Sequence, residues 1–511
     1  MAAITDKAAK PGASGMLAAG LAAFAAALAV RLVGIDSRDL WLDEIYTQFA
    51  ASRDWLGLID DRVSRGHSPF YFALLKLSGI DPADIAALRA LSAVFDAGAA
   101  GILAAGVLRY FGARAALMVA VLYVLAPLQI HWAQNARPYG LLMFFTALGL
   151  TGAIGLVAAI GQDDAARGRG PDMLFAVGWS GACFTLTGGI LAYLVVLSVP
   201  WWPGLRNGAL ADPGFRRRWV RAQRLPSVVA FLTYMLVSRI HVFDRIGDYW
   251  LEDRRPFGLE SLTLLGEEIA AGAVGQSGLT LMEAAGLPLA MLTLVAVLCA
   301  ATFAVTRPAL WPKSLPLAAL GLGLLCLMLA MSLNTSLLTG RYFTPAWLGL
   351  LTAAGIGIAT LRPALQVAVA APLVALMLPL ALTAATAPSD LRAEAPKSIA
   401  ALIDTVSERH APMVIDRAIF REVRMELMLL RLDEPALPRP AMNGAEDGEA
   451  ARERAADGAP FFIVARPGDW HENYHAEHAS SACLAERDGW SIALVRPGTA
   501  AACAPPFPNA P

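Results

Sequence analysis

The sequence predicts an all-α polytopic membrane protein of about eleven transmembrane helices with a small C-terminal α/β extracytoplasmic domain. Apolar runs long enough to cross a bilayer recur up to Thr386, and basic residues alternate between the loops that join them. Only 16% of the 511 residues are charged, whereas soluble domains carry about a quarter. We therefore expect a membrane domain over 1–386, a soluble domain over 387–497 and a disordered Ala- and Pro-rich tail over 498–511.

The expected spans are defined by hydropathy. They lie at about 16–33, 88–108, 115–130, 139–160, 172–187, 189–203, 226–239, 286–306, 314–333, 342–361 and 364–386. Lys7 and Lys10 precede the first run, and Ala27-Leu28-Ala29 resembles a signal-peptidase site. Because apolar sequence continues to Val33, we expect this run to remain as an anchor.

Charge gives the orientation independently. If the N-terminus is cytoplasmic, alternate loops should be rich in Lys and Arg. They are: Arg109, Arg114, Arg167, Arg169, Arg206, Arg216, Arg217, Arg218, Arg221, Arg224, Arg307, Lys313 and Arg362 lie on that side. The short opposite loops hold little more than Arg137 and Arg341, so both are expected on the outer face with Asp43, Glu44 and His67.

The first outer loop, 35–69, holds the main candidate site. The adjacent carboxylates Asp43 and Glu44 lie between apolar and aromatic residues, at the start of an amphipathic segment that runs to Ile59. A carboxylate there would take a proton from an attacking hydroxyl, or would be a solvated loop acid. His67 either binds substrate or caps the chain before Pro69, where a short half-inserted segment begins and continues to Gly79.

Two further outer loops present an arginine. Arg137 lies in the short segment from His131 to Tyr139 and Arg341 precedes Tyr342; each would bind a phosphate or extend to the lipid headgroups. The outer loop 240–285 adds Arg245, Arg254 and Arg255 as weaker anion-binding candidates. Asp96, near the middle of a span, is either a functional relay or the partner of a neighbouring helix.

The soluble domain offers less chemistry. Residues 413–415, 461–464 and 491–495 are expected to be strands, with a helix over 418–432. His471, His475 and His478 have a spacing that suits zinc, although the surrounding acids favour a solvated surface. Cys483 and Cys503 would form a disulfide only in an oxidising compartment.

Several function classes find no support. A net charge of −1 and the absence of a basic stripe with aromatics give no case for nucleic acid. The chain lacks GxxxxGK[ST], GxGxxG, HExxH and GxSxG motifs, so a lipid-linked donor is the natural energy source. A transporter or flippase would place ionisable groups near the midplane in repeated halves.

Four motifs carry a resemblance. LWLDE, HSPFYFALLKL, AQNARPYGLL and GRYFTPAWLGLL, in this order, resemble the multi-spanning GT-C glycosyltransferases, in the bacterial branch related to protein O-mannosyltransferases and the lipid A aminoarabinose transferase. The resemblance covers about the first 160 residues and the segment near Arg341. It implies a bacterial inner-membrane enzyme with a periplasmic site, which transfers a sugar from a polyprenyl-phosphate donor by one inverting displacement.

The resemblance also implies roles for individual residues. Asp43 matches the catalytic acid and Glu44 its neighbour, while Arg137 and Arg341 match positions that meet the donor phosphate. His67, Tyr71, His131, Gln134, Tyr139 and Tyr342 are the accompanying substrate-binding candidates. Asn135 stands where glutamate is common, so no cofactor is expected and a divalent metal is not supported.

The acceptor stays open between lipid A, a wall polymer, a capsule and a protein, and the sugar stays open too. A transporter or flippase, or a non-catalytic envelope assembly factor that binds through the outer domain, are the alternatives.

Overall fold

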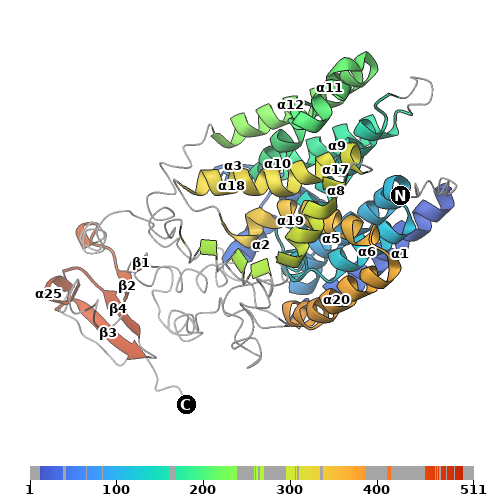
Figure 1. Cartoon of the computed structure of the whole chain (residues 1–511). Coiled ribbons are helices and arrows are strands. Elements are labelled where there is room, and N and C mark those ends of the chain that lie inside the picture. Colours follow the sequence, from blue (N-terminus) through green and yellow to red (C-terminus); the bar gives the residue numbers. More distant parts are fainter. Residues whose placement is uncertain are drawn as a thin grey trace. The chain divides into compact units, whose positions relative to one another are not determined.

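The structure is a computed structural model of the whole chain. It describes residues 12–37, 42–64, 66–82, 84–161, 168–238, 258, 261–262, 265–266, 268–269, 295–304, 306–307, 310–333, 338–386, 411, 413–415, 455–465, 468, 470, 474–478, 480–487 and 490–498. The chain forms two compact units. Unit 1 comprises Met1–Arg38 and Arg53–Pro388, and unit 2 comprises Asp39–Ser52 and Ser389–Pro511. Figure 1 labels the helices and strands of both.

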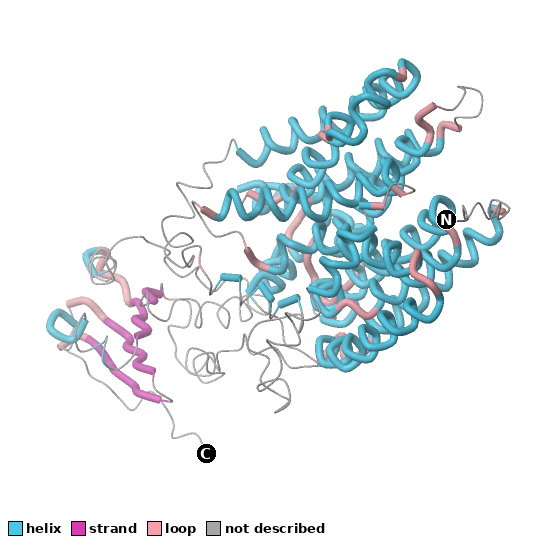
Figure 2. The backbone as a smooth tube through the Cα atoms, viewed as in Figure 1, coloured by secondary structure: helices cyan, strands magenta, loops and turns pink. Residues whose placement is uncertain are grey.

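Unit 1 is helical throughout its described secondary structure (Figure 2). Its elements are α1 (Ala13–Leu32), α3 (Trp55–Ser64), α4 (Phe70–Leu77), α5 (Ile85–Phe111), α6 (Ala113–Val124), α7 (Pro127–Ala133), α8 (Tyr139–Ala158), α9 (Gly170–Thr185), α10 (Thr187–Leu197), η2 (Val199–Trp201), α11 (Pro203–Ala211), α12 (Pro213–Ser238), α17 (Trp311–Ala318), η3 (Ala319–Gly323), α18 (Leu324–Ser332), α19 (Gly340–Ala359) and α20 (Pro363–Thr386).

Six helices among the described residues are long and apolar enough to cross a membrane. They are α1, α5, α8, the continuous helix Trp311–Ser332, α19 and α20. The predicted run 115–130 is divided between α6 and α7, which meet at 60°, as in a broken span or a re-entrant loop. Thr187–Trp201 and Val295–Ala304 are shorter apolar helices, and 172–187 and 226–239 fall largely within α9 and α12. The chain is a polytopic helical protein, and the count of about eleven spans stays a prediction.

One end of the helices in unit 1 meets the basic loops. Lys313 Nζ donates to the carbonyl of Tyr110 at the end of α5 (3.3 Å), and Arg307 Nη1 donates to the carbonyl of Thr360 at the end of α19 (3.4 Å). The residues Lys313 and Arg307 of the basic loops therefore contact the C-terminal ends of α5 and α19. The N-terminal ends of these two helices lie at the opposite face.

A buried ion pair stabilises the same end of the helices in unit 1. Asp172, in the first turn of α9, accepts hydrogen bonds from Arg218 and from Arg221 Nη2 (3.1 Å) of α12. Arg218 Nη2 also donates to the carbonyl of Gly168 (2.9 Å). These predicted cytoplasmic arginines thus join α12 to the start of α9.

Unit 2 contains α2 (Leu42–Ser52) and a four-stranded sheet. Its strands are β1 (Met413–Ile415), β2 (Phe461–Ala465), β3 (Ala482–Arg487) and β4 (Trp490–Val495), in the order β1-β2-β4-β3, with β1 parallel to β2 and the other pairs antiparallel. One face of the sheet packs on Trp470 and Tyr474. Three strands match those expected, whereas β3 was not expected; the helix expected over 418–432 and residues 499–511 lie outside the described residues.

The polar candidates of unit 2 separate by burial. His478 is buried against the ring of Phe461, while His475, on the same short helix α25 (His475–His478), is exposed. His471 lies outside the described residues. Cys483 is disulfide-bonded, and Cys503 is not among the described residues.

Candidate active site

The site in unit 1 is built on the break between α6 and α7. The chain passes from α6 through Leu125 and Ala126 into Pro127, which opens α7 and has no N–H to continue the α6 hydrogen-bond ladder. Every residue of α7 is buried. The break turns α7 away from α6 and delivers the predicted outer segment His131–Tyr139 to the N-terminal ends of α8 and α5.

The loop after α7 is held by backbone carbonyls. Gln134 Nε2 donates to the carbonyls of Arg31 (3.0 Å) and Val33 (2.7 Å) at the end of α1. Asn135 Nδ2 donates to the carbonyl of His131 (2.6 Å). Gln134 and Asn135 therefore shape the loop with their amides, which makes them positioning residues.

Arg137 is fixed through its own carbonyl. Ser92 Oγ donates to the Arg137 carbonyl (2.9 Å) and lies 2.7 Å from the hydroxyl of Tyr71. Since the single Ser92 proton is used on Arg137, the Tyr71 hydroxyl donates to Ser92. Tyr71 is fully buried. Three elements far apart in sequence thus meet at Arg137: α4, α5 and the start of α8.

A glycine makes this meeting possible. A Cβ on Gly140 would lie 2.2 Å from the carbonyl oxygen of Ser92, closer than real Cβ contacts come. The first turn of α8 therefore approaches the α5 backbone at a distance that only glycine permits. Close packing of α8 on α5 therefore explains why this position of the ARPYG motif is a glycine.

Two guanidinium groups lie on one aromatic ring. The Cζ atom of Arg62 is 4.8 Å and that of Arg137 is 5.8 Å from the centre of the Phe72 ring. Arg62 is paired with its neighbour Asp61 (Nε to Oδ2, 2.8 Å), and both are buried. Since Asp61 balances the charge of Arg62, these two arginines and this carboxylate together carry a net charge of +1, which suits an anionic group. Arg62, Asp61 and Phe72 were not among the site residues predicted from the sequence.

Aromatic rings line the same loop. Trp132 contacts Tyr139 edge-on, with 4.8 Å between ring centres, and contacts His131 at 4.9 Å. All three are buried, with exposed fractions of 8%, 4% and 7%. His131 and Tyr139, predicted as substrate-binding residues, therefore both contact Trp132, one before and one after Arg137 in the sequence.

Arg341 lies where α19 begins, against α7. Gln129 Nε2, on α7, donates to the carbonyl of Thr344 (3.0 Å), and a Cβ on Gly340 would lie 2.7 Å from Leu128 Cδ1. The Gly340 N–H donates to Glu268 Oε2. Arg341 is half-buried with its Cζ 5.1 Å from the Tyr342 ring centre. The first turn of α19 thus contacts the start of α7, about 10 Å along this helix from the Arg137 loop.

The remaining predicted residues are placed as follows. His67 is half-buried in the turn after α3, and its N–H donates to the carbonyl of Arg62 (2.9 Å). Asp43 and Glu44 occupy the first turn of α2 in unit 2, where Glu44 is fully buried and Asp43 half-buried. Arg245, Arg254 and Arg255 lie outside the described residues.

A cavity elsewhere in unit 1 is lined only by apolar side chains. It measures about 490 Å³ and is lined by alanine, leucine and valine side chains of α1, α5 and α6. With no polar side chain in its wall, it offers no acid, base or anion-binding group. We therefore place the candidate site at the Arg137 loop.

Comparison with known proteins gives a fold and no sequence relative. No family model and no curated protein matches the chain. Among solved structures, ArnT from Cupriavidus metallidurans matches in the form bound to undecaprenyl phosphate (TM-score 0.55, 16% identity, 96% of this chain and 99% of that one) and in the apo state (TM-score 0.57, 15% identity, 93% and 97%).

An archaeal structure matches as well. The oligosaccharyltransferase AglB from Archaeoglobus fulgidus, in complex with an inhibitory peptide and a dolichol-phosphate, aligns with a TM-score of 0.51 and 11% identity over 93% of this chain and 74% of that one. ArnT and AglB both belong to the GT-C superfamily. At such identities the likeness establishes the fold.

Proposed function

Because the chain has the fold of the GT-C superfamily, we propose that it is a membrane glycosyltransferase that moves a sugar from a polyprenyl-phosphate donor to an envelope acceptor. The observation that carries this proposal is the pair of buried guanidinium groups, Arg62 and Arg137, on the ring of Phe72. ArnT and AglB were solved with undecaprenyl phosphate and dolichol-phosphate, respectively, which supports a lipid phosphate as the anion.

In the proposed mechanism Asp43 acts as the general base. The acceptor hydroxyl loses its proton to Asp43 and attacks the anomeric carbon, the bond to the donor phosphate oxygen breaks, and the configuration inverts. Asp43 is the more exposed acid of the pair, while Glu44 is fully buried, so Asp43 is the better placed to meet an acceptor.

Arginines stabilise the leaving group. Charge develops on the phosphate oxygen as the bond to the sugar breaks, and Arg137, with Arg341 at the other end of α7, would bind the phosphate through charge-assisted hydrogen bonds. His67, His131, Tyr139 and Tyr342 would line the sugar, whereas Tyr71 and Gln134 act by holding the loop. The proposed location is a bacterial inner membrane with the site on the periplasmic side.

No step of this mechanism runs through a metal ion. Within the described part of the chain no three His, Cys, Asp or Glu side chains lie close enough to hold an ion. We expect EDTA to leave the transfer rate within about twofold, measured on purified protein.

The test of the function is consumption of the donor. Purified protein in nanodiscs is incubated with radiolabelled polyprenyl-phosphate sugars, each in turn, and with an envelope extract as acceptor source. We expect label to leave the lipid fraction and polyprenyl phosphate to accumulate. An intact donor in every reaction, or a donor that is only moved across a vesicle membrane, would instead favour a binding protein or a flippase.

Two matched substitutions sharpen this test. Asp43→Asn is expected to lower the rate at least about 1,000-fold, because the proton acceptor is lost, while Asp60→Asn, the same change at an exposed acid of the same loop, keeps the rate. Arg137→Gln is expected to raise the donor KM, while Arg114→Gln, at an exposed arginine of the opposite end, does not. Transfer at the original rate by Asp43→Asn removes Asp43 from the mechanism.

A further inference from the structure

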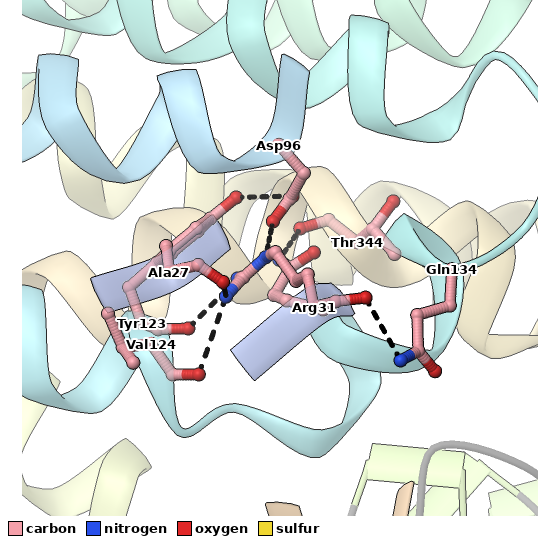
Figure 3. A network of polar contacts seen from close by, with 8 residues as sticks. Ala27, Arg31, Asp96, Tyr123, Val124, Gln134 and Thr344 are labelled. Carbon is pink, nitrogen blue, oxygen red and sulfur yellow. Dashed lines mark hydrogen bonds and ion pairs between the residues drawn. The ribbon is translucent and has the colours of Figure 1, made fainter. Parts of the chain in front are cut away.

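A buried ionic cluster lies next to the break between α6 and α7. Arg31 of α1 pairs through Nε with Asp96 Oδ2 of α5, and both side chains are almost fully buried. The hydroxyl of Tyr123, on α6, donates to the other carboxylate oxygen of Asp96 (2.7 Å). Of the two roles open to Asp96 from the sequence, the bond to a neighbouring helix is the one observed. We call Arg31, Asp96, Tyr123 and Gln134 the Arg31 cluster (Figure 3).

The guanidinium of Arg31 also serves the broken helix. Nη2 lies 3.3 Å from the carbonyl oxygen of Tyr123, and Nη1 lies 3.5 Å from that of Val124 and 3.3 Å from that of Ala27. The ladder partner of the Tyr123 carbonyl would be the N–H of residue 127, which is proline, and this carbonyl accepts instead a long hydrogen bond from the Ala126 N–H (3.4 Å). Inside a bilayer, a carbonyl at a break in a helix is stabilised by a further donor. Arg31 supplies it.

The same residue reaches the far end of α7. The backbone carbonyl of Arg31 accepts a hydrogen bond from Gln134 Nε2 (3.0 Å), just beyond the last residue of α7. Figure 3 shows the side chain of Arg31 directed to Asp96, Tyr123 and Val124, and its carbonyl directed to Gln134. One residue of α1 therefore bonds to the chain before and after the seven-residue α7, which carries the Arg137 loop.

We infer that Arg31 is a positioning residue: it caps the broken span through its guanidinium, Asp96 neutralises it, and together they fix the direction of α7 and so the place of Arg137. This inference rests on the proposed function for its catalytic consequence, but not for its structural one. The guanidinium is required because a lysine ammonium can pair with Asp96 without also spanning the two carbonyls.

The experiment compares Arg31→Lys with the original chain in two measurements. Hydrogen exchange, followed by mass spectrometry in nanodiscs, is expected to rise at least about fivefold over residues 127–137 and to stay unchanged in the second half of α8. The kcat for transfer is expected to fall at least about tenfold while the acceptor KM stays within about twofold. The exchange measurement needs no activity, so it decides the inference even if the proposed transfer is absent.

The control is a second buried arginine. Arg218→Lys makes the same change in the pair with Asp172 on α9, distant in sequence from the Arg31 cluster, and is expected to leave both exchange over 127–137 and kcat unaltered. If Arg31→Lys fails to insert, Gln134→Met removes the bond at the other end of α7 and is expected to raise exchange over the same residues. Unchanged exchange over 127–137 in the inserted variant overturns the inference, whatever happens to the rate.

Discussion

Phe72 and Arg137 lie in contact, with the guanidinium carbon of Arg137 5.8 Å from the centre of the phenyl ring. Arg62 lies 4.8 Å from the same ring. The quadrupole of the buried ring attracts both guanidinium groups. This attraction offsets part of the repulsion between their like charges and so keeps them close together. The ring therefore helps assemble the positive centre in which we place the donor phosphate.

The first prediction follows from this contact. Phe72→Leu keeps an apolar side chain but removes the ring, so the donor KM is expected to rise about 3- to 10-fold. Phe175→Leu, at another fully buried phenylalanine that packs against Trp179, gives the same loss of volume away from the arginines. Steady-state kinetics with varied donor check the difference; equal KM values in the two variants would contradict a role for the ring.

The second prediction concerns the chain of hydroxyl groups under Arg137. Ser92→Ala leaves the buried Tyr71 hydroxyl without this acceptor and the Arg137 carbonyl without this donor, so it is expected to lower the free energy of unfolding by about 1–3 kcal/mol. Tyr71→Phe removes the hydroxyl that bonds to Ser92 and is expected to lower the free energy of unfolding by about 1 kcal/mol. Reversible unfolding in mixed micelles measures both.

The double variant decides whether the two residues act together. Tyr71→Phe with Ser92→Ala is expected to be less destabilised than the sum of the single variants by about 1 kcal/mol, because their shared bond is lost only once. Strict additivity would mean that Tyr71 and Ser92 contribute independently.

Much of the fold was predicted from hydropathy and charge. The apolar runs near 16–33, 88–108, 139–160, 314–333, 342–361 and 364–386 are helices of spanning length, and the basic loops contact the ends of α5 and α19 that were expected. The period and length of the apolar runs suffice to predict these helices. A lipid-exposed helix must form its backbone hydrogen bonds internally and present apolar side chains to the lipid.

The break at Pro127 was not predicted, although the signal was present. Residues 115–130 are apolar enough for one span, and hydropathy averages over the proline that ends α6. The residue before a proline is driven out of the helical region, so the sequence Ala126-Pro127 marks a boundary. The role of Arg31, at the end of a predicted span, was also missed. It depends on contacts with the carbonyls of Tyr123 and Val124, more than ninety residues later in the chain.

Burial of the loop residues could not be predicted. Asp61 and Arg62 are adjacent charges in a polar stretch, and nothing in their spacing distinguishes a buried pair from a solvated one. Their burial depends on the packing of Phe72 and the Arg137 loop, which are long-range contacts. Strand β3 was missed for a local reason: its sequence, ACLAER, contains no β-branched or aromatic residue and so carries little strand signal.

The last prediction tests the close approach of α5 and α8. Gly140→Ala would place a methyl group 2.2 Å from the Ser92 carbonyl oxygen. The backbone can relieve this overlap only if α5 and α8 move apart. We expect a loss of about 3 kcal/mol or more in the free energy of unfolding, because overpacking against backbone is not relieved by a rotamer change. Gly188→Ala, whose Cβ would meet its nearest neighbour at 4.0 Å, should be neutral or stabilising by up to about 1 kcal/mol. Equal stability of the two variants would show that α8 does not approach α5 this closely.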